Sequence, residues 1–472
     1  MNPLDRARRH RHAAAPSGSC AELRATLALA APLAAANLAQ TAMSVTDTVM
    51  VGRLGAAPLA AAGLGAMLYF SSGIMLQGVL SAVGPLVAHA RGAGDRNAAN
   101  RVCGAGLALA IIAAVPFIVV LSELDRLLVA FGYNPALGAE IGSFLRAIAW
   151  GGPAFLGCAV LRNLLAALSH TRAVMIVLCG AVAGNALLNW ALIFGHLGAP
   201  ALGITGSGYA SAVDQWLILI GLTLCTRVLA GRAGVHPLRG VAAAGRVELA
   251  KILRLGLPIG GIMGVELGVF LATGILIGLL GAAALGAHQL ALNCASTSFM
   301  VPLGLSQAAT VRVAYELGAG RAAAARRAAF VALGLGTGFM GMMAVVLWTM
   351  PQAIIAVYVN PGDPANRELV HIARHLLAVA AVFQVFDGMQ TIAAGALRGY
   401  RDTMTPMLLA GFGYWGAGFV GGWVLGFPLG MGAVGLWCGL ALGLAVVAVL
   451  LTVRLWLVAR PGHPAAEAIA LR

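Results

Sequence analysis

Twelve apolar runs divide this chain of 472 residues and constrain its fold more than any other feature. In lipid only helices and closed barrels satisfy their own backbone hydrogen bonds, and a helix needs ~20 apolar residues to cross. Hydrophobic residues make up 60% of the chain and charged residues only 10%, against about 25% charged in soluble domains. We therefore predict an all-α integral membrane protein with twelve transmembrane helices. The runs cover residues 25–50, 59–86, 102–121, 142–165, 173–194, 206–225, 255–279, 287–311, 328–348, 372–397, 407–425 and 434–453.

Basic residues alternate from loop to loop between these runs. All but five of the 30 Lys and Arg fall on one side of the predicted membrane. The exceptions are Arg53, Arg126, Arg146, Arg367 and Arg374. The positive-inside rule then predicts a multi-pass protein of the cell inner (plasma) membrane with both termini cytoplasmic. We attribute the excess of basic residues to this topology and to attraction to anionic lipid, and not to nucleic-acid binding. The first run is longer than a signal-peptide core of roughly 7 to 15 residues, and the cysteines form no CxxC pair.

The second half of the chain repeats the first. A shift of 226 residues places Pro32 on Pro258, Gly55 on Gly281 and Gly94 on Gly320 without a gap. Each half has an even number of helices, so the repeat is parallel, an architecture of transporters whose substrate path lies between the halves. No phosphate loop, HExxH or GxSxG motif is present, so we expect neither an enzyme nor a prosthetic group. The predicted organisation is a cytoplasmic tail (1–24), an N-lobe (25–226), a cytoplasmic linker (227–254), a C-lobe (255–457) and a second cytoplasmic tail (458–472).

Four carboxylates lie inside predicted helices: Asp47, Asp214, Glu266 and Asp387. The predicted spans place no Lys or Arg at their depth, and Arg162 and Arg398 are assigned to cytoplasmic loops. An ionised side chain at the centre of a membrane helix costs about 2.5 kcal/mol or more. Such a group must bind a cation, line water or hold a proton. The alternative is that these acids only join helices through hydrogen bonds.

Polar neighbours favour cation coupling. Asn185 and Asn189 are four residues apart and share a helix face, where their amide oxygens suit Na⁺ beside a carboxylate. Asp387 lies on a polar stripe, and the repeat pairs Glu266 with a glutamine and Asp47 with a threonine. The candidate coupling residues are Asp47, Asn185, Asn189, Glu266 and Asp387, with Asp214, Gln40, Thr273, Gln384, Gln390 and Thr391 as accessory residues. A Na⁺ ion could bind at Asp47, Asn185 and Asn189, or at Glu266 and Asp387.

Four segments carry a resemblance to a known family: "QTAMSVTDTVMVGRLG", "GNALLNWALIFG", "GAHQLALNCASTSFMVPLGLSQAATVRV" and "FQVFDGMQTIAAGALRGYRD". The whole chain resembles the multidrug and toxic compound extrusion (MATE) family, in its bacterial NorM-like branch. The resemblance implies two alternating six-helix lobes that export amphipathic organic cations in exchange for Na⁺ or H⁺. It matches Asp47, Asn185 and Asn189 to the N-lobe cation site. The C-lobe acids it matches are Glu266 and Asp387. Two positions depart from the family pattern: Phe383 replaces a frequent tyrosine, and Asp214 replaces an uncharged residue.

The predicted function is therefore secondary multidrug antiport by a monomer in contact with membrane lipid, with the choice between Na⁺ and H⁺ left open. Residues that could line an adaptable apolar cavity are Met43, Phe155, Phe270, Met389, Tyr414 and Trp415, although each could equally face lipid. The alternatives are a flippase for lipids or lipid-linked oligosaccharides, and a passive channel. A flippase for pyrophosphate lipids should place Arg or Lys in its cavity, whereas the predicted cavity charges are acidic.

Overall fold

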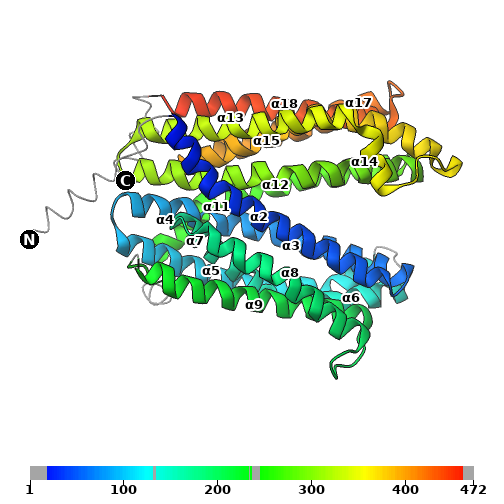
Figure 1. The fold of residues 1–472 in the computed structure, drawn as a ribbon, viewed down its shortest axis with the longest axis horizontal. Coiled ribbons are helices and arrows are strands. Elements are labelled where there is room, and N and C mark those ends of the chain that lie inside the picture. Colours follow the sequence, from blue (N-terminus) through cyan, green and yellow to red (C-terminus); the bar gives the residue numbers. More distant parts are fainter. Residues whose placement is uncertain (1–18, 131–133, 233, 237–244, 461–472) are drawn as a thin grey trace, which may run out of the picture. The chain divides into compact units, whose positions relative to one another are not determined.

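The computed structural model describes residues 19–130, 134–232, 234–236 and 245–460, and these residues form helices joined by short turns (Figure 1). The predicted tails and the linker lie partly outside the described residues. The first half comprises α2 (Ser19–Gly52), α3 (Ala56–Ser81), α4 (Val83–Gly92), α5 (Arg96–Ala130), α6 (Pro135–Ala149), α7 (Gly152–Ala167), α8 (Thr171–Phe194) and α9 (Gly203–Arg232). The second comprises α11 (Arg246–Gly278), α12 (Ala282–Gly318), α13 (Ala322–Thr349), α14 (Pro351–Tyr358), η1 (Pro364–Asn366), α15 (Arg367–Gly399), α16 (Met404–Gly411), η2 (Phe412–Phe419), α17 (Val420–Gly426) and α18 (Gly432–Val458).

Each predicted run corresponds to one helix or to consecutive helices. Among the described residues, ten helices are long and apolar enough to cross a membrane, and α6 with α7 makes an eleventh span that bends by 49°. The bend follows from the sequence, because Gly151 and Gly152 precede Pro153 at the start of α7. The remaining predicted span is α12, whose Asn, Ser, Thr and Gln side chains lower its hydropathy.

The backbone confirms the repeat. Gly55 and Gly281 have φ of 116° and 110°, and Gly94 and Gly320 have φ of 77° and 73°. Both members of each pair therefore occupy a region that side chains disfavour. After the second pair, Asp95 N donates to Ala90 O at 2.9 Å, and Arg321 N donates to Glu316 O at 2.8 Å. Equivalent turns of the two halves thus close in the same way.

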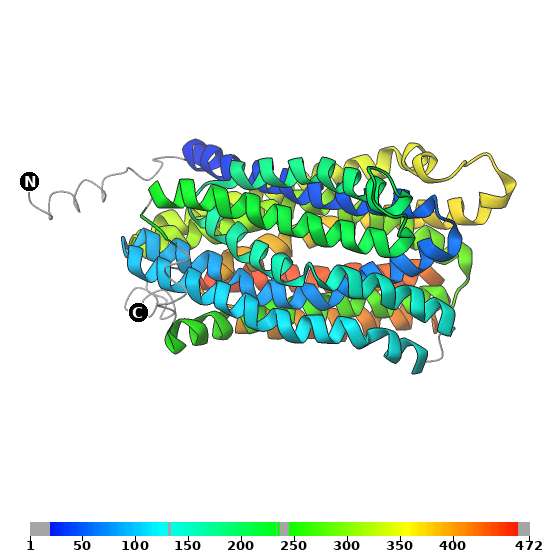
Figure 2. The same ribbon diagram turned by 90° about the horizontal axis from the view of Figure 1, so that it is seen from below.

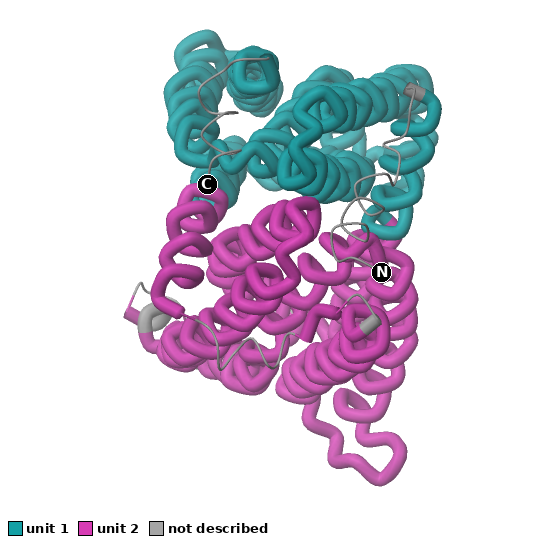
Figure 3. The backbone as a smooth tube through the Cα atoms, turned by 90° about the vertical axis from the view of Figure 1, so that its left-hand side faces the viewer, with its two compact units in different colours: residues 1–34, 261–472 teal, residues 35–260 magenta. Residues whose placement is uncertain are grey.

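The chain divides into two compact units: residues 1–34 with 261–472, and residues 35–260 (Figure 3). These boundaries differ from the predicted lobes. The first turns of α2 pack with unit 1, where the backbone of Ala30 and Ala34 leaves no room for a side chain at Gly304. Likewise the first turns of α11 pack with unit 2, where Val79 and its neighbours approach Gly256. Helices α2 and α11 therefore each begin in one unit and end in the other.

Small residues allow close helix packing inside each unit. In unit 1, α12, α13, α15 and α18 run side by side, as both views show (Figures 1 and 2). A Cβ atom on Gly439 of α18 would lie 2.1 Å from the Cα atom of Gly422 in α17, the type of approach that small residues permit in lipid. In unit 2, one face of α5 stays exposed at Ile111, Val115 and Val119, as expected for a lipid-facing helix.

Candidate functional site

Asp47 of α2 meets the two asparagines of α8 inside unit 2. Asn185 Nδ2 and Asn189 Nδ2 donate to Asp47 Oδ1 at 3.0 and 2.6 Å, and Ser211 Oγ of α9 donates to Asp47 Oδ2 at 3.4 Å. The spacing of four residues on α8 aims both amides at one point. The structure therefore brings together the three predicted residues of this site and adds Ser211. A sequence signal for Ser211 exists, since it lies three residues before Asp214 on the same helix.

Asp214 lies next to this group. It is 1% exposed, its carboxylate interacts electrostatically with Asp47, and its Oδ1 and Oδ2 accept no hydrogen bond from the described residues. Asn185 Oδ1 and Asn189 Oδ1 are also buried without a donor. We call Asp47, Asn185, Asn189, Ser211 and Asp214 the Asp47 cluster. Its surplus of buried oxygen acceptors suits a bound cation or proton, because buried acceptors without partners are costly.

The second acidic site lies in unit 1 and joins α11 to α15. Gln390 Nε2 donates to Asp387 Oδ1 at 3.2 Å, to Glu266 Oε1 at 3.4 Å and to Thr391 Oγ1 at 3.1 Å. A single amide group is thus shared between two carboxylates. We call Glu266, Asp387, Gln390 and Thr391 the Glu266 cluster. Asp387 is buried and Glu266 is half-buried, and two such like charges with so few described donors favour a bound cation or a proton.

Two residues beside the Glu266 cluster change the sequence-based interpretation. Arg398 acts electrostatically on Glu266, and its Nε is buried without an acceptor among the described residues. The prediction that Arg398 lies in a loop is therefore wrong, because α15 continues to Gly399. Tyr414, predicted only as a cavity residue, is 1% exposed, interacts electrostatically with both acids, and has a hydroxyl without a described partner. It belongs to the π-helix η2, a distortion that often marks functional sites.

Three accessory residues form no hydrogen bond with these acids among the described residues. Gln384 Oε1 accepts a hydrogen bond from Ser298 Oγ at 2.9 Å. Thr273 is buried seven residues beyond Glu266, and no hydrogen bond between described residues joins the two. Gln40 contacts Arg162 instead of Asp47, since Arg162 Nη1 donates to Gln40 Oε1 at 2.8 Å.

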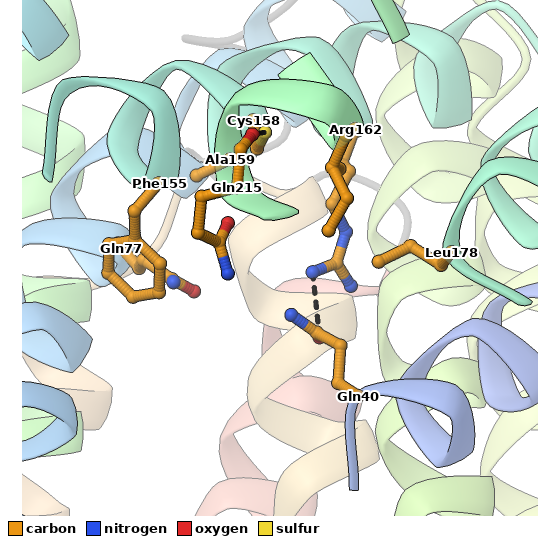
Figure 4. Close-up of a pocket in the computed structure, with 9 residues that line it drawn as sticks. Gln40, Gln77, Phe155, Cys158, Ala159, Arg162, Leu178 and Gln215 are labelled. Carbon is orange, nitrogen blue, oxygen red and sulfur yellow. Dashed lines mark hydrogen bonds between the residues drawn. The ribbon is translucent and has the colours of Figure 1, made fainter. Parts of the chain in front are cut away.

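Arg162 corrects two further predictions. It lies within α7, which continues to Ala167, and not in the cytoplasmic basic cluster predicted to follow this helix. It also lines a pocket of unit 2 (Figure 4). The charges around this pocket are therefore not acidic alone, and the sign of the cavity charges does not separate an exporter from a flippase.

The predicted cavity residues fall into different environments. Phe155 lines the same pocket as Arg162 and packs with Tyr69 at a ring distance of 5.2 Å. Met43 is buried. Phe270 packs edge-on against Phe383 at 6.0 Å, and Met389 is partly buried against the core of unit 1. Trp415 is 40% exposed, and its Nε1 donates to Val265 O at 3.2 Å, next to Glu266.

A duplicated bundle of membrane-length helices with an acidic cluster inside each half defines the class of secondary transporters built from parallel repeats. A family model described as MatE matches residues 32–191 and 258–424, so its two matches begin at Pro32 and Pro258, the paired prolines of the repeat. The chain belongs to the MatE family of transporters, and it is not an enzyme.

Curated relatives cover nearly the whole chain. "Multidrug resistance protein NorM" from Burkholderia vietnamiensis is 47% identical over 447 residues, which are 94% of this chain and 96% of that protein. "Probable multidrug resistance protein NorM" from Mesorhizobium japonicum is 42% identical over 92% of this chain and 94% of its own.

Solved structures share the fold. The crystal structure of the eukaryotic MATE transporter AtDTX14 has a TM-score of 0.84 at 21% identity, covering 97% of this chain and all of that one. A multidrug resistance MATE family transporter in an outward-facing conformation has a TM-score of 0.82 at 17% identity and covers 93% of this chain and 96% of its own. The twelve-helix fold class predicted from the apolar runs is confirmed.

Proposed function

We propose that this protein is a secondary active antiporter of the inner membrane that exports amphipathic organic cations in exchange for Na⁺ or H⁺ by alternating access. The Asp47 cluster supports this proposal, because carboxylate and amide oxygens that lack donors among the described residues lie together there inside a membrane bundle, as a cation site requires. Relatives named as multidrug resistance proteins support drug export. The alternating basic loops support cytoplasmic termini.

The Asp47 cluster would couple the two fluxes by alternating between a filled and an empty state. Filled by Na⁺ or a proton, its buried oxygens gain the partner that they lack. Emptied, it favours the entry of a cationic substrate into the same lobe. A ligand shifts the equilibrium between two conformations only by its differential affinity for them. The coupling ion and the substrate must therefore prefer opposite orientations of the cavity.

The Glu266 cluster offers a second site of the same kind. Glu266 and Asp387 share the amide of Gln390, so a cation or a proton between them would relieve their repulsion. Tyr414 supplies a hydroxyl near these acids, in a chain where Phe383 lacks the one frequent in the family. Arg398 offsets one of the two negative charges when both acids are ionised.

Proteoliposomes test the proposal directly. Purified protein is reconstituted, loaded with a fluorescent organic cation, and exposed separately to an inward Na⁺ gradient and an inward pH gradient. Antiport predicts saturable dye efflux that one of the two gradients accelerates. Equal flux with and without a gradient, without saturation, would identify a passive channel. No dye flux together with movement of a fluorescent lipid between leaflets would identify a flippase.

A further inference from the structure

Arg162 lies inside the helical bundle of unit 2, and no described residue forms an ion pair with it. Its Nη1 donates to Gln40 Oε1 at 2.8 Å and its Nη2 donates to Asn37 Oδ1 at 3.1 Å, so both described contacts are with neutral amides. Other half-buried arginines differ. Arg312, for example, forms a two-pronged ion pair with Glu22, with both distances 2.7 Å. A desolvated guanidinium is costly unless an anion compensates it.

The acids of unit 2 do not supply that anion. Asp47 is bound by Asn185, Asn189 and Ser211. Asp214 and Arg162 both act electrostatically on Cys158, but no ion pair between described residues joins Arg162 to either acid. The positive charge of the guanidinium is therefore not balanced by an acid among the described residues of unit 2.

The pocket beside Arg162 offers hydrogen-bond donors and no carboxylate. Gln40, Gln77, Gln215 and Cys158 line it, and Phe155 forms part of its apolar wall (Figure 4). Asn37 adds to this pattern, since it is 3% exposed and its Nδ2 has no acceptor among the described residues. The cavity volume of the pocket is about 10 Å³, which is room for about one water-sized group, so it suits a small ion or a single functional group.

The repeat shows which partner is missing. Position 40 corresponds to position 266 under the shift of 226 residues. In unit 1 the residue at this position is Glu266, a carboxylate on which Arg398 acts electrostatically. In unit 2 the residue is Gln40, which accepts a hydrogen bond from Arg162 but carries no charge. Each half thus has an arginine that interacts with this position, and only in unit 1 is the residue there an acid.

We propose that the Arg162 pocket binds one monovalent anionic group, either a free halide such as chloride or a carboxylate carried by a transported molecule. The guanidinium would donate charge-assisted hydrogen bonds, which are stronger than neutral ones, and the surrounding amides would add neutral bonds. The carboxylate source rests on the proposed drug export. The halide source does not depend on it.

Two variants test the site from opposite directions. Arg162→Gln removes the positive charge. Gln40→Glu keeps Arg162 and places a carboxylate where the Gln40 amide oxygen now accepts the hydrogen bond from Arg162 at 2.8 Å. Both should abolish anion binding, although only the first deletes the arginine. Arg172→Gln, at an exposed position at the start of α8, is the control for net charge. Each variant counts as folded if it elutes as a single species in size-exclusion chromatography and has the near-UV circular dichroism spectrum of the parental protein.

The first measurement titrates purified full-length protein with chloride against gluconate at constant Na⁺ and pH, and follows the ³⁵Cl NMR linewidth. The second measures equilibrium binding of an amphipathic amine that carries a carboxylate and of its methyl ester. Loss of a hydrogen bond to a charged group predicts at least about a tenfold weaker affinity in both variants, with Arg172→Gln unchanged.

The outcomes separate the sources. Saturable chloride broadening that both variants lose identifies the halide. Weaker binding of the carboxylate ligand in both variants, with ester binding unchanged, identifies a carboxylate. If neither the chloride linewidth nor the affinity for the carboxylate ligand changes in both variants, the anion site is excluded. In that case, unchanged binding of the ester still leaves the proposed export of cations intact, and absence of ester binding to the parental protein would count against that function separately.

Discussion

At the scale of single residues, the proposed coupling makes Asp47 the group at which ion entry and drug release should compete. Its carboxylate accepts both asparagine amides of α8, and only a charged group can exchange one cation for another. We expect the apparent affinity for an organic cation to fall as Na⁺ rises or as pH drops in the parental protein. Asp47→Asn should abolish this dependence. The measurement is equilibrium binding to purified protein between about pH 5.5 and 8.5, a range in which buried carboxyl groups can titrate. A parental affinity indifferent to both ions would contradict the role of Asp47.

The two acids of the Glu266 cluster should be required for coupled transport. Asp387→Asn and Glu266→Gln preserve side-chain shape but remove the charges for which cation and substrate compete. We expect each variant to reach the membrane in parental amounts and to lose gradient-driven dye efflux. Efflux at the parental rate in both variants would show that these acids are structural.

Gln390 holds the two acids of that cluster through one shared amide. Gln390→Leu keeps a similar volume but leaves both carboxylates without this donor, at a cost of about 1 to 3 kcal/mol for an unsatisfied buried group. We expect slower efflux and a lower Tm, with protonation or cation binding restoring part of the stability. A Tm equal to that of the parental protein would show that Gln390 does not bridge the acids.

At the scale of helices, close contacts between small residues set how α18 packs. A Cβ atom on Gly439 would overlap the backbone of Gly422, whereas one on Gly411 would meet nothing within 4 Å. Gly439→Ala should therefore lower Tm, since overpacking costs about 1 to 3 kcal/mol. Gly411→Ala is the matched control and should leave Tm unchanged or raise it, because Ala favours helix. Equal thermal stability of the two variants would refute this packing.

At the scale of the whole molecule, the alternation of basic loops predicts which loops face outward. Asp363 lies in the turn before η1 and is exposed, and we expect Asp363→Cys in a cysteine-free background to react with a membrane-impermeant reagent from outside the cell. Ala93→Cys, at the exposed end of α4, should react only after the membrane is opened. Labelling of position 363 only from the cytoplasm would reverse the topology.

The sequence by itself determined the class of fold, because helices in lipid can be predicted from the length and hydropathy of their apolar runs. It also determined the repeat, whose paired glycines Gly55 and Gly281 share a left-handed φ. The meeting of Asp47 with Asn185 and Asn189 was predictable too, since helical spacing and the family resemblance both point to it.

Only the tertiary structure decided where the ends of helices place their charges. Arg162 and Arg398 occur near predicted boundaries, which sequence patterns locate only to within a few residues, and one helical turn separates a solvated loop from a buried site. Tyr414 and Gln40 acquired their partners in the same way, from helices distant in the sequence. Periodicity states which face of a helix a residue occupies. Which neighbour that face meets is settled by packing between helices.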